Sequence, residues 1–453
     1  MAFNLLAHRL RDLWRYGQIY LVLLLACSVR CPITGVVGRL QLQGYADSSQ
    51  TRDQANCVGS ATLCSLRQSD RRLVEMAQPK LAAKYMDSLL GDYAAARKKL
   101  VGNFIKRSNV AVVYMCFERM EMIHRAIPAI LRSDGLADFD LFISQDGGAP
   151  SIFDDKALSI PSGTQYVYIH HPANLCTGLH HYFVKAFAFD IMGYDTLLVV
   201  EEDNVIHQQA LQLLHRMSEL SISEPKIGIV SLLDMDMSPF LDPAHYAEGL
   251  IRTVGAMGHL WVFGLHRSKY EAARGHLRDY YLVIKGHDYR MKHEPPLRDA
   301  IEGLLREKGI EDTSVLSQDR WFINSMALSG FAQRYQTLFR FFQPIGYYGL
   351  HFQMNESHFF GLFGRGMFNG RINPAAVFDV TKDPAHAAAM KATVRARLET
   401  LYNKYWGGLP PPEELVNDTF HGLLEGRLNG REAVQEIMSG PKNPPPTNLG
   451  MQE

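Results

Sequence analysis

The stretch TLLVVEEDNVIH, residues 196–207, joins a run of core-forming residues to a cluster of acids. Residues 197–200 are apolar and partly β-branched, with no polar alternation, which predicts a strand buried on both faces. Glu201, Glu202 and Asp203 follow at once, where that strand reaches the surface. Like charges this close raise one another's pKa, so a positive group is expected beside them. A divalent metal ion is the first candidate, and a solvated acidic loop is the alternative.

Strand and helix patterns alternate on both sides of this stretch. Further strands are expected at residues 110–117, 138–148, 165–171 and 227–235, with amphipathic helices between them. Repeated units of this kind predict an α/β fold with a mixed, mostly parallel sheet and helices on both faces. Such sheets bind ligands at the carboxyl ends of their strands. Glu118, Arg119, Asp146 and Asp203 all come just after predicted strands, so we expect them to converge.

The composition limits the possible functions. Lys plus Arg and Asp plus Glu each number 47 in 453 residues, so a formal net charge of zero gives no support for a nucleic-acid partner. The chain has no GxGxxG after the first strand and no GxxxxGK[ST], which argues against a dehydrogenase and a P-loop NTPase. A hard cation held by carboxylates often bridges to substrate phosphates, so the acidic cluster suits nucleotide-sugar chemistry.

Four stretches resemble one family of enzymes. VVEEDNVI resembles the acidic DXD-type motif of GT-A glycosyltransferases, in the form found in N-acetylglucosaminyltransferase I and the protein O-mannose N-acetylglucosaminyltransferases. VVYMCFER (112–119), ISQDGG (143–148) and GYYGLHF (346–352) resemble further segments of these enzymes in the same order. The resemblance implies a GT-A, Rossmann-like fold. It also implies metal-dependent inverting transfer of a sugar, N-acetylglucosamine from UDP-GlcNAc, to a glycan or glycoprotein acceptor.

The resemblance also implies roles on the donor side of the site. Asp203 would bind Mn²⁺ or Mg²⁺, Glu202 would face the ribose or the metal, and Glu201 would shape the turn or hold the site's hydrogen bonds. Asp146 would contact the uracil or ribose, and Arg119 the nucleotide. Two of these residues have plain alternatives, because Asp146 could form the turn before Gly-Gly and Arg119 could start a helix.

An inverting transfer also needs a carboxylate that deprotonates the acceptor hydroxyl. Asp319, in SQDRWF, is the best match to the family's base, with a helix N-cap as its alternative role and with Asp288 and Asp312 as competitors. His351 would bind the metal or a phosphate, or else it packs among the aromatic residues around it.

The ends of the chain complete the expected organisation. IYLVLLLACSV, residues 19–29, follows basic residues, which is typical of a signal-anchor or a cleaved signal, or else forms a buried or interfacial helix. We expect a tail and anchor (1–30), a stem and helical lead-in (31–107), a GT-A catalytic domain (108–430) and a disordered tail (431–453). This organisation predicts a type II Golgi membrane protein with a lumenal domain, or a secreted one.

Three other functions remain open. The first is a GT-A transferase of another family, with a different donor or a retaining mechanism. The second is a catalytically silent glycan-binding or scaffold protein on the same fold. The third is a nucleotidyltransferase, which usually carries a Gly-rich loop with Lys or Arg after the first strand, and no such loop follows Tyr114.

Overall fold

The structure is a computed structural model. It describes residues 78–232, 250–256, 260–337, 340–349, 354–363, 366–379, 384–405, 410–411 and 413–424. These residues all belong to one compact unit, residues 67–453. The predicted anchor and the predicted disordered tail lie outside the described residues. Within the described ranges, no helix is both long enough and apolar enough to cross a membrane.

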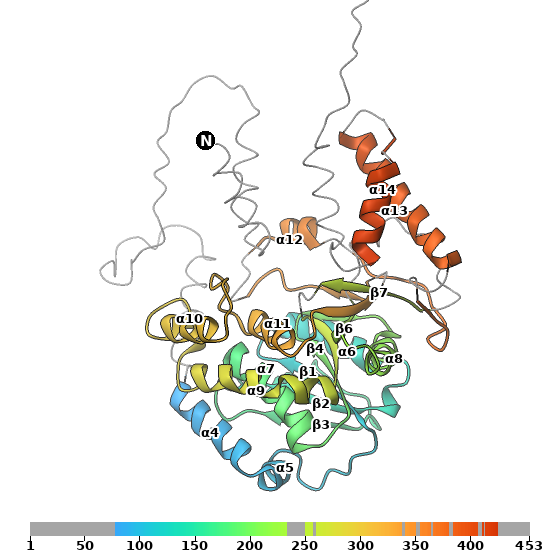
Figure 1. Cartoon of the computed structure of the whole chain (residues 1–453). Helices are drawn as coiled ribbons and strands as arrows, with labels where there is room; N and C mark the ends of the chain where they lie inside the picture. Colours follow the sequence, from blue (N-terminus) through green and yellow to red (C-terminus); the bar gives the residue numbers. More distant parts are fainter. Residues whose placement is uncertain are drawn as a thin grey trace, which may run out of the picture. The chain divides into compact units, whose positions relative to one another are not determined.

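A nine-stranded sheet lies at the centre of the described part, in the order β11-β7-β9-β6-β8-β4-β1-β2-β3 (Figure 1). Its strands are β1 Val110–Cys116, β2 Asp140–Gln145, β3 Tyr166–His170, β4 Thr196–Glu201, β6 Ile227–Ser231, β7 Leu250–Ala256, β8 Val262–His266, β9 Gln333–Thr337 and β11 Val377–Asp379. Two short strands, β5 Asn204–Ile206 and β10 Phe342–Pro344, form a separate antiparallel pair.

The sheet is mixed and mostly parallel, as the sequence predicts. Strands β3, β2, β1 and β4 form a parallel block, and five of the eight pairings in the whole sheet are parallel. Strand β8 runs antiparallel between β4 and β6, which the strand–helix pattern did not predict. The parallel block carries the residues discussed below.

Helices cover both faces of this sheet. One face packs against α6 Met120–Leu131 and α8 Ala210–Ser221, and alternate β1 residues such as Val112 and Tyr114 point into that core. The other face takes Ala111 and Val113 of β1 and packs against six helices. These are α4 Pro79–Gly91, α5 Tyr93–Val101, α7 Cys176–Ala186, α9 Arg267–Ile284, α10 Leu297–Glu307 and α11 Gln318–Leu328. Because the side chains of a strand alternate, β1 can serve two cores only if it is apolar throughout.

The predicted helical lead-in packs with the sheet. Helix α4 begins at Pro79, since proline lacks the N–H that the first turn leaves unpaired. Ala82, Met86 and Leu89 are at most 1% exposed and share a core with Phe142 of β2. The segment is therefore part of the same folded body as the sheet.

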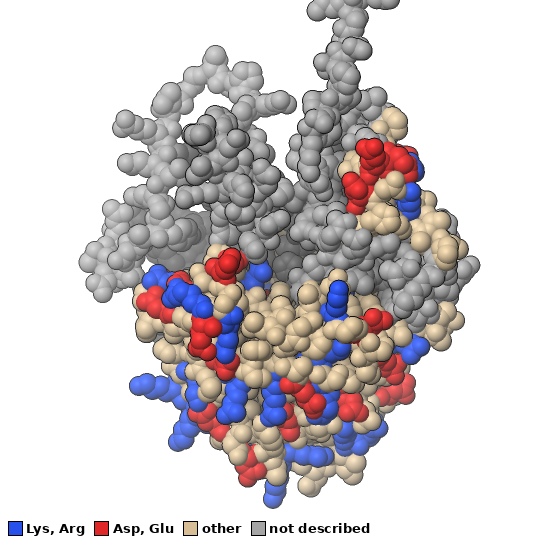
Figure 2. All heavy atoms as spheres, in the orientation of Figure 1, with Lys and Arg blue, Asp and Glu red and all other residues tan. Residues whose placement is uncertain are grey.

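The remaining described helices follow late in the chain. They are α12 Glu356–Phe363, α13 Pro384–Tyr405 and α14 Glu413–Leu424. Val394 of α13 and Val416 of α14 are buried in the core on the α6 and α8 side of the sheet. On the face shown in Figure 2, basic and acidic side chains are interspersed over the lower elements, in keeping with the equal numbers of the two kinds.

Candidate active site

The carboxyl ends of β1 and β4 lie side by side at the point where the strand order reverses. The chain runs outward from β1 through β2 to β3, and then returns through α7 to β4 on the other side of β1. In open α/β sheets, ligands bind at such a reversal, outside the carboxyl ends of the strands. We call this place, at the carboxyl ends of β1 and β4, the crevice. Arg119 follows β1, Glu201 ends β4, and Glu202 and Asp203 come directly after it, so the predicted charged cluster lies at this crevice.

Arg119 provides a positive charge beside these acids. Its Nε donates to Oε1 of Glu202 at 2.5 Å, and its Nη2 donates to Oδ2 of Asp203 at 3.0 Å. Burial disfavours the charged guanidinium, but the two carboxylates outweigh burial and raise the pKa of Arg119. Arg119 holds the N-cap position of α6 without a side-chain cap, so its side chain serves the carboxylates and not the helix.

Glu202 is the most enclosed acid of this group, with 6% of its side chain exposed. Its second carboxylate oxygen accepts a short hydrogen bond from the backbone N–H of Phe117, directly after β1. Its backbone carbonyl accepts a hydrogen bond of 3.2 Å from the Tyr114 hydroxyl. Burial raises the pKa of Glu202, and Arg119 opposes that effect. Glu202 therefore ties β1 to β4 and has little surface left for a ligand.

Asp203 is the more accessible partner of Arg119, with 25% of its side chain exposed. The Asn204 amide donates to its Oδ1 at 3.0 Å, and the Ile345 N–H donates to its backbone carbonyl at 2.8 Å. A Cβ at Gly346 would lie 2.2 Å from Oδ2 of Asp203, so only glycine allows this approach. The segment after β10 thus fixes the position of the carboxylate.

The same segment is fastened to the start of α6. The Tyr347 hydroxyl donates to Oε1 of Glu121 at 2.8 Å, and the Tyr348 hydroxyl donates to Oε2 at 3.2 Å. Arg119 donates to the backbone carbonyl of Tyr348 at 3.0 Å. Part of the predicted GYYGLHF motif therefore lies against the residues that follow β1.

Glu201 belongs to a second group of ionisable side chains, together with His181, Lys185 and Asp319. Nε2 of His181, on α7, is 3.2 Å from Oε1 of Glu201. One turn later, Lys185 donates to the backbone carbonyl of His181 at 3.0 Å, and its Nζ lies 4.6 Å from the centre of the Phe322 ring. Asp319, in the first turn of α11, interacts electrostatically with His181, Lys185 and Glu201. Three elements of the fold therefore meet at the end of β4.

Burial controls the protonation of this second group. It lowers the pKa of His181 to about 3, which leaves the imidazole neutral at pH 7. It also lowers the pKa of Lys185 to about 8, against the attraction of Asp319 and Glu201. Burial raises the pKa of both Glu201 and Asp319, and the neighbouring carboxylate adds to the rise in each case, Asp203 for Glu201 and Glu201 for Asp319. A carboxyl group held in this way is a better proton acceptor than a fully solvated one.

The geometry separates Asp319 from its competitors. Ser317 caps α11 by accepting a hydrogen bond from the Arg320 N–H, so the alternative role of Asp319 as the N-cap is wrong. Asp288 is held by the guanidinium of Arg290, at 2.9 and 2.5 Å. Asp312 accepts from both the N–H and the hydroxyl of Ser314. Of these three acids, only Asp319 interacts with the group at the end of β4.

Asp146 follows β2, as predicted, but its carboxylate serves the backbone. Its Oδ1 accepts from the N–H groups of Leu175 and Gly147, at 2.6 and 2.9 Å. Only 5% of the residue is exposed, and burial raises its pKa to about 7. Asp146 therefore links the end of β2 to the segment that begins α7, which is the turn-forming role left open as its alternative.

The donor atoms at the crevice suit a cation that shares its ligands with substrate. His351 lies outside the described residues. Within the described ranges, no three His, Cys, Asp or Glu residues are grouped closely enough to hold a metal ion by themselves. Magnesium-type ions are often held by one or two carboxylates plus substrate phosphates, and Asp203 offers one partly exposed carboxylate of this kind. The residues present therefore fit an ion that binds together with a diphosphate.

Sequence reasoning gave no role to His181 and Lys185. The doublets at 170–171 and 180–181 are conspicuous in the sequence, and three of the four histidines are buried. His180 donates to or accepts from the buried hydroxyl of Ser144, whereas His181 points to Glu201. The usable signal was the spacing of four between His181 and Lys185, which places both on one face of the helix that leads into β4.

Comparisons with known proteins find only partial structural similarity to this chain. No family model matches the chain, and no curated protein matches it. The chain is similar in part to the WbbM bifunctional glycosyltransferase, with 12% identity over 40% of this chain and 35% of that chain and a TM-score of 0.27. It is similar to the glycosyltransferase GlyE of Streptococcus pneumoniae TIGR4, with 12% identity over 45% of this chain and 44% of that chain and a TM-score of 0.22. A third similar structure is the mannosyltransferase PcManGT of Pyrobaculum calidifontis in complex with GDP-Man and Mn²⁺, with 10% identity over 80% of this chain and 85% of that chain and a TM-score of 0.27.

This chain spans less than half the length of the WbbM and GlyE structures. The three similar structures are glycosyltransferases, but their TM-scores are too low to support an argument about the function of this chain. The function has to be argued from the crevice itself.

Proposed function

We propose that the protein is a metal-dependent inverting glycosyltransferase that moves a sugar from a nucleoside-diphosphate donor to a glycan or glycoprotein acceptor. One observation carries the proposal. Arg119 and Asp203 share a crevice at the reversal of the strand order, and a separate group of Glu201, His181, Lys185 and Asp319 adjoins it. A group transfer needs these two parts, since one must stabilise the leaving group and the other must take a proton.

The first part suits the diphosphate. Arg119 offers a guanidinium, whose planar fork matches phosphate oxygens, and it is held in place by Glu202. Asp203, the partly exposed carboxylate beside Arg119, would hold a divalent ion, Mn²⁺ or Mg²⁺. When bound, such an ion supplies positive charge against the departing diphosphate.

The second part suits the acceptor. Asp319 takes the proton of the acceptor hydroxyl as that oxygen forms its bond to the anomeric carbon of the sugar. The bond from the anomeric carbon to the diphosphate breaks, and its electron pair leaves with the diphosphate oxygen. The raised pKa of Asp319 favours its acceptance of the proton, and the cation of Lys185 moderates that rise.

The finer features of the proposal come from the sequence resemblance. UDP-GlcNAc is the proposed donor because VVEEDNVI and its companion stretches resemble the N-acetylglucosaminyltransferases. The proposed location, a Golgi membrane with the catalytic part in the lumen, rests on the basic and apolar pattern of residues 8–30. Contacts of Asp146 with the uracil or ribose are not included, since its carboxylate is bound by backbone N–H groups.

The direct test follows the release of nucleoside diphosphate by the full chain from a panel of sugar nucleotides, with and without Mn²⁺. We expect slow, metal-dependent hydrolysis of one donor, and we expect Asp203→Asn to abolish it. Asp138→Asn is the matched control, because Asp138 is exposed and lies next to β2, away from the crevice.

Two results would reject the transferase, and a third would reject only its inverting mechanism. If no donor binds in a metal-dependent way by calorimetry, the crevice is not a donor site. If a donor binds but no acceptor from a glycan array is modified, the silent glycan-binding alternative replaces the transferase. A product that retains the donor's anomeric configuration would reject the inverting mechanism alone.

A further inference from the structure

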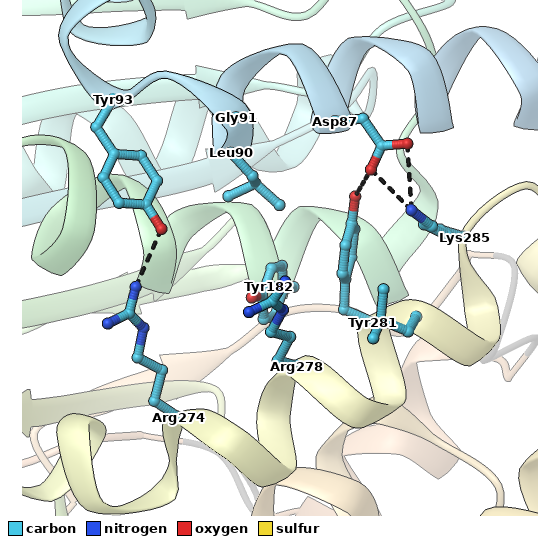
Figure 3. Close-up of a pocket in the computed structure, with 10 residues that line it drawn as sticks. Asp87, Leu90, Gly91, Tyr93, Tyr182, Arg274, Arg278, Tyr281 and Lys285 are labelled. Atoms are coloured by element: carbon cyan, nitrogen blue, oxygen red, sulfur yellow. Dashed lines mark hydrogen bonds and ion pairs between the residues drawn. The ribbon is translucent and has the colours of Figure 1, made fainter.

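A pocket of about 240 Å³ lies among the helices that cover one face of the sheet. Its walls come from α4, the start of α5, α7 and α9 (Figure 3). None of its lining residues belongs to the candidate active site. The lining side chains include three cations, Arg274, Arg278 and Lys285, and one acid, Asp87.

Two of the three cations are already bound by the protein. Arg274 lies 3.2 Å from the carboxylate of Asp190 and donates to the Tyr93 hydroxyl at 3.0 Å. Lys285 donates to both carboxylate oxygens of Asp87, at 2.8 and 3.2 Å. These pairs hold the rim in place and offset most of its charge.

Arg278 is different. The described residues give its guanidinium no hydrogen bond and no ion pair, and they place it within electrostatic range of Tyr182 and Tyr281. The side chain is exposed. A guanidinium has N–H donors in a planar fork that matches a carboxylate or a phosphate. Arg278 is therefore an anion-binding group that has no anion within the described part of the chain.

The walls beside Arg278 are flat and apolar. Tyr182 and Tyr281 stack with ring centres 4.5 Å apart and planes 12° apart. The Tyr281 hydroxyl donates to Asp87 at 2.8 Å, which holds the stack against α4. Leu90 and Leu282 add aliphatic surface, and Leu282 is 48% exposed. Stacked tyrosines next to aliphatic side chains suit a small ring that has an apolar face.

We propose that this pocket binds a single sugar unit that carries one oxyanion, a phosphate or a carboxylate, with the anion on Arg278 and the ring against Tyr182. The volume is below the usual range for drug-sized ligands, so the occupant is about the size of one monosaccharide. The assignment of the anion rests on Arg278 alone. The assignment of the ring as a sugar rests on the proposed function.

The test is calorimetry of the full chain with glucose 6-phosphate, glucuronate, inorganic phosphate and glucose as separate probes. We expect glucose 6-phosphate or glucuronate to bind, and the better of the two identifies the oxyanion. Arg278→Gln should weaken that binding about ten-fold or more, because a charge-assisted hydrogen bond is lost. Tyr182→Leu should weaken the binding of the two anionic sugars, glucose 6-phosphate and glucuronate, and leave the binding of inorganic phosphate unchanged.

Two control variants keep the result specific. Arg216→Gln changes an exposed arginine on α8, and it should leave binding unchanged. Asp203→Asn should also leave it unchanged, since Asp203 belongs to the crevice. Binding that Asp203→Asn changes and Arg278→Gln does not would place the probe in the crevice and overturn the proposal, as would the absence of heat with all four probes at millimolar concentration.

Equal binding of inorganic phosphate and glucose 6-phosphate would overturn the sugar assignment and support the anion assignment. Metal-dependent donor binding is measured by calorimetry in parallel on the wild type and on Arg278→Gln. A wild type that binds no donor rejects the proposed function, whereas binding of the four probes to the pocket is a separate measurement that still tests the anion assignment.

Discussion

Nη2 of Arg119 lies 3.0 Å from Oδ2 of Asp203, and this contact joins the end of β1 to the end of β4. Helices α6 and α7 and strands β2 and β3 lie between these two residues in the chain, and the pairing of β1 with β4 in the sheet brings them together. The same guanidinium binds Glu202, which is far less exposed than Asp203. Glu202 therefore anchors Arg119, and Asp203 is the carboxylate that a ligand can reach.

We predict that Arg119→Met lowers the free energy of unfolding by about 3 kcal/mol, since it leaves the buried Glu202 carboxylate without its cation. Arg119→Lys should recover part of this loss, because an ammonium keeps the charge but cannot reach both carboxylates as a fork. Urea unfolding of the three proteins measures the effect. Arg216→Met is the control and should change stability little, as its ion pair with Glu219 is exposed. Equal stability of Arg119→Met and the wild type would show that the ion pair is not structural.

We predict that Gly346→Ala destabilises the fold by about 1–3 kcal/mol and lowers donor hydrolysis. The new methyl group would lie 2.2 Å from Oδ2 of Asp203, so either the carboxylate or the segment after β10 has to move. Gly303→Ala on α10 is the matched control, because nothing lies within 4 Å of a Cβ there and a helix prefers alanine. If both variants have the stability and the donor hydrolysis rate of the wild type, the fold and the reaction do not depend on the close approach at Gly346.

The parallel half of the fold could be predicted from the sequence because its signal is local. Each strand is a short apolar run, and each helix between strands has an amphipathic pattern, so the sequence predicts the order of the elements in residues 110–201. The placement of Arg119 and Asp203 together followed from one further rule, that ligands bind at the carboxyl ends of parallel strands. The antiparallel insertion of β8 between β4 and β6 gave no such signal, since strand direction depends on long-range pairing.

The chemistry around Glu201 could not be predicted, because burial determines it. His181 and Lys185 read as a histidine and a lysine within an apolar helix, which more often marks a packed or snorkelling side chain. The structure encloses both and directs them to the end of β4. Similarly, the acids suggested a metal ion as their counter-charge, whereas the described structure places the guanidinium of Arg119 there. No local sequence pattern distinguished a metal ion from an arginine as the counter-charge of these acids.

We predict that Asp319→Asn lowers the rate of sugar transfer by about 10²–10⁴-fold and leaves donor binding unchanged, since a general base is lost and the crevice is intact. Transfer rates at saturating donor, together with calorimetric donor affinity, separate the two effects. Asp312→Asn and Asp288→Asn are matched controls, because their carboxylates bind Ser314 and Arg290. If Asp319→Asn keeps full transfer activity and one of the two control variants loses it, the general base is the residue changed in that control.

We predict that the stability of the wild type relative to Lys185→Met rises by about 3 kcal/mol between about pH 8 and pH 10.5. Burial lowers the pKa of Lys185 from 10.5 to about 8, despite the nearby carboxylates of Asp319 and Glu201. In this range the unfolded chain binds a proton that the folded chain has released, so raising the pH favours the fold. Urea unfolding of both proteins at several pH values gives the difference directly. Lys80→Met, at an exposed position on α4, should show no such trend. A difference for Lys185→Met that stays constant across this range would mean that Lys185 remains charged in the fold and that Asp319 faces a permanent cation.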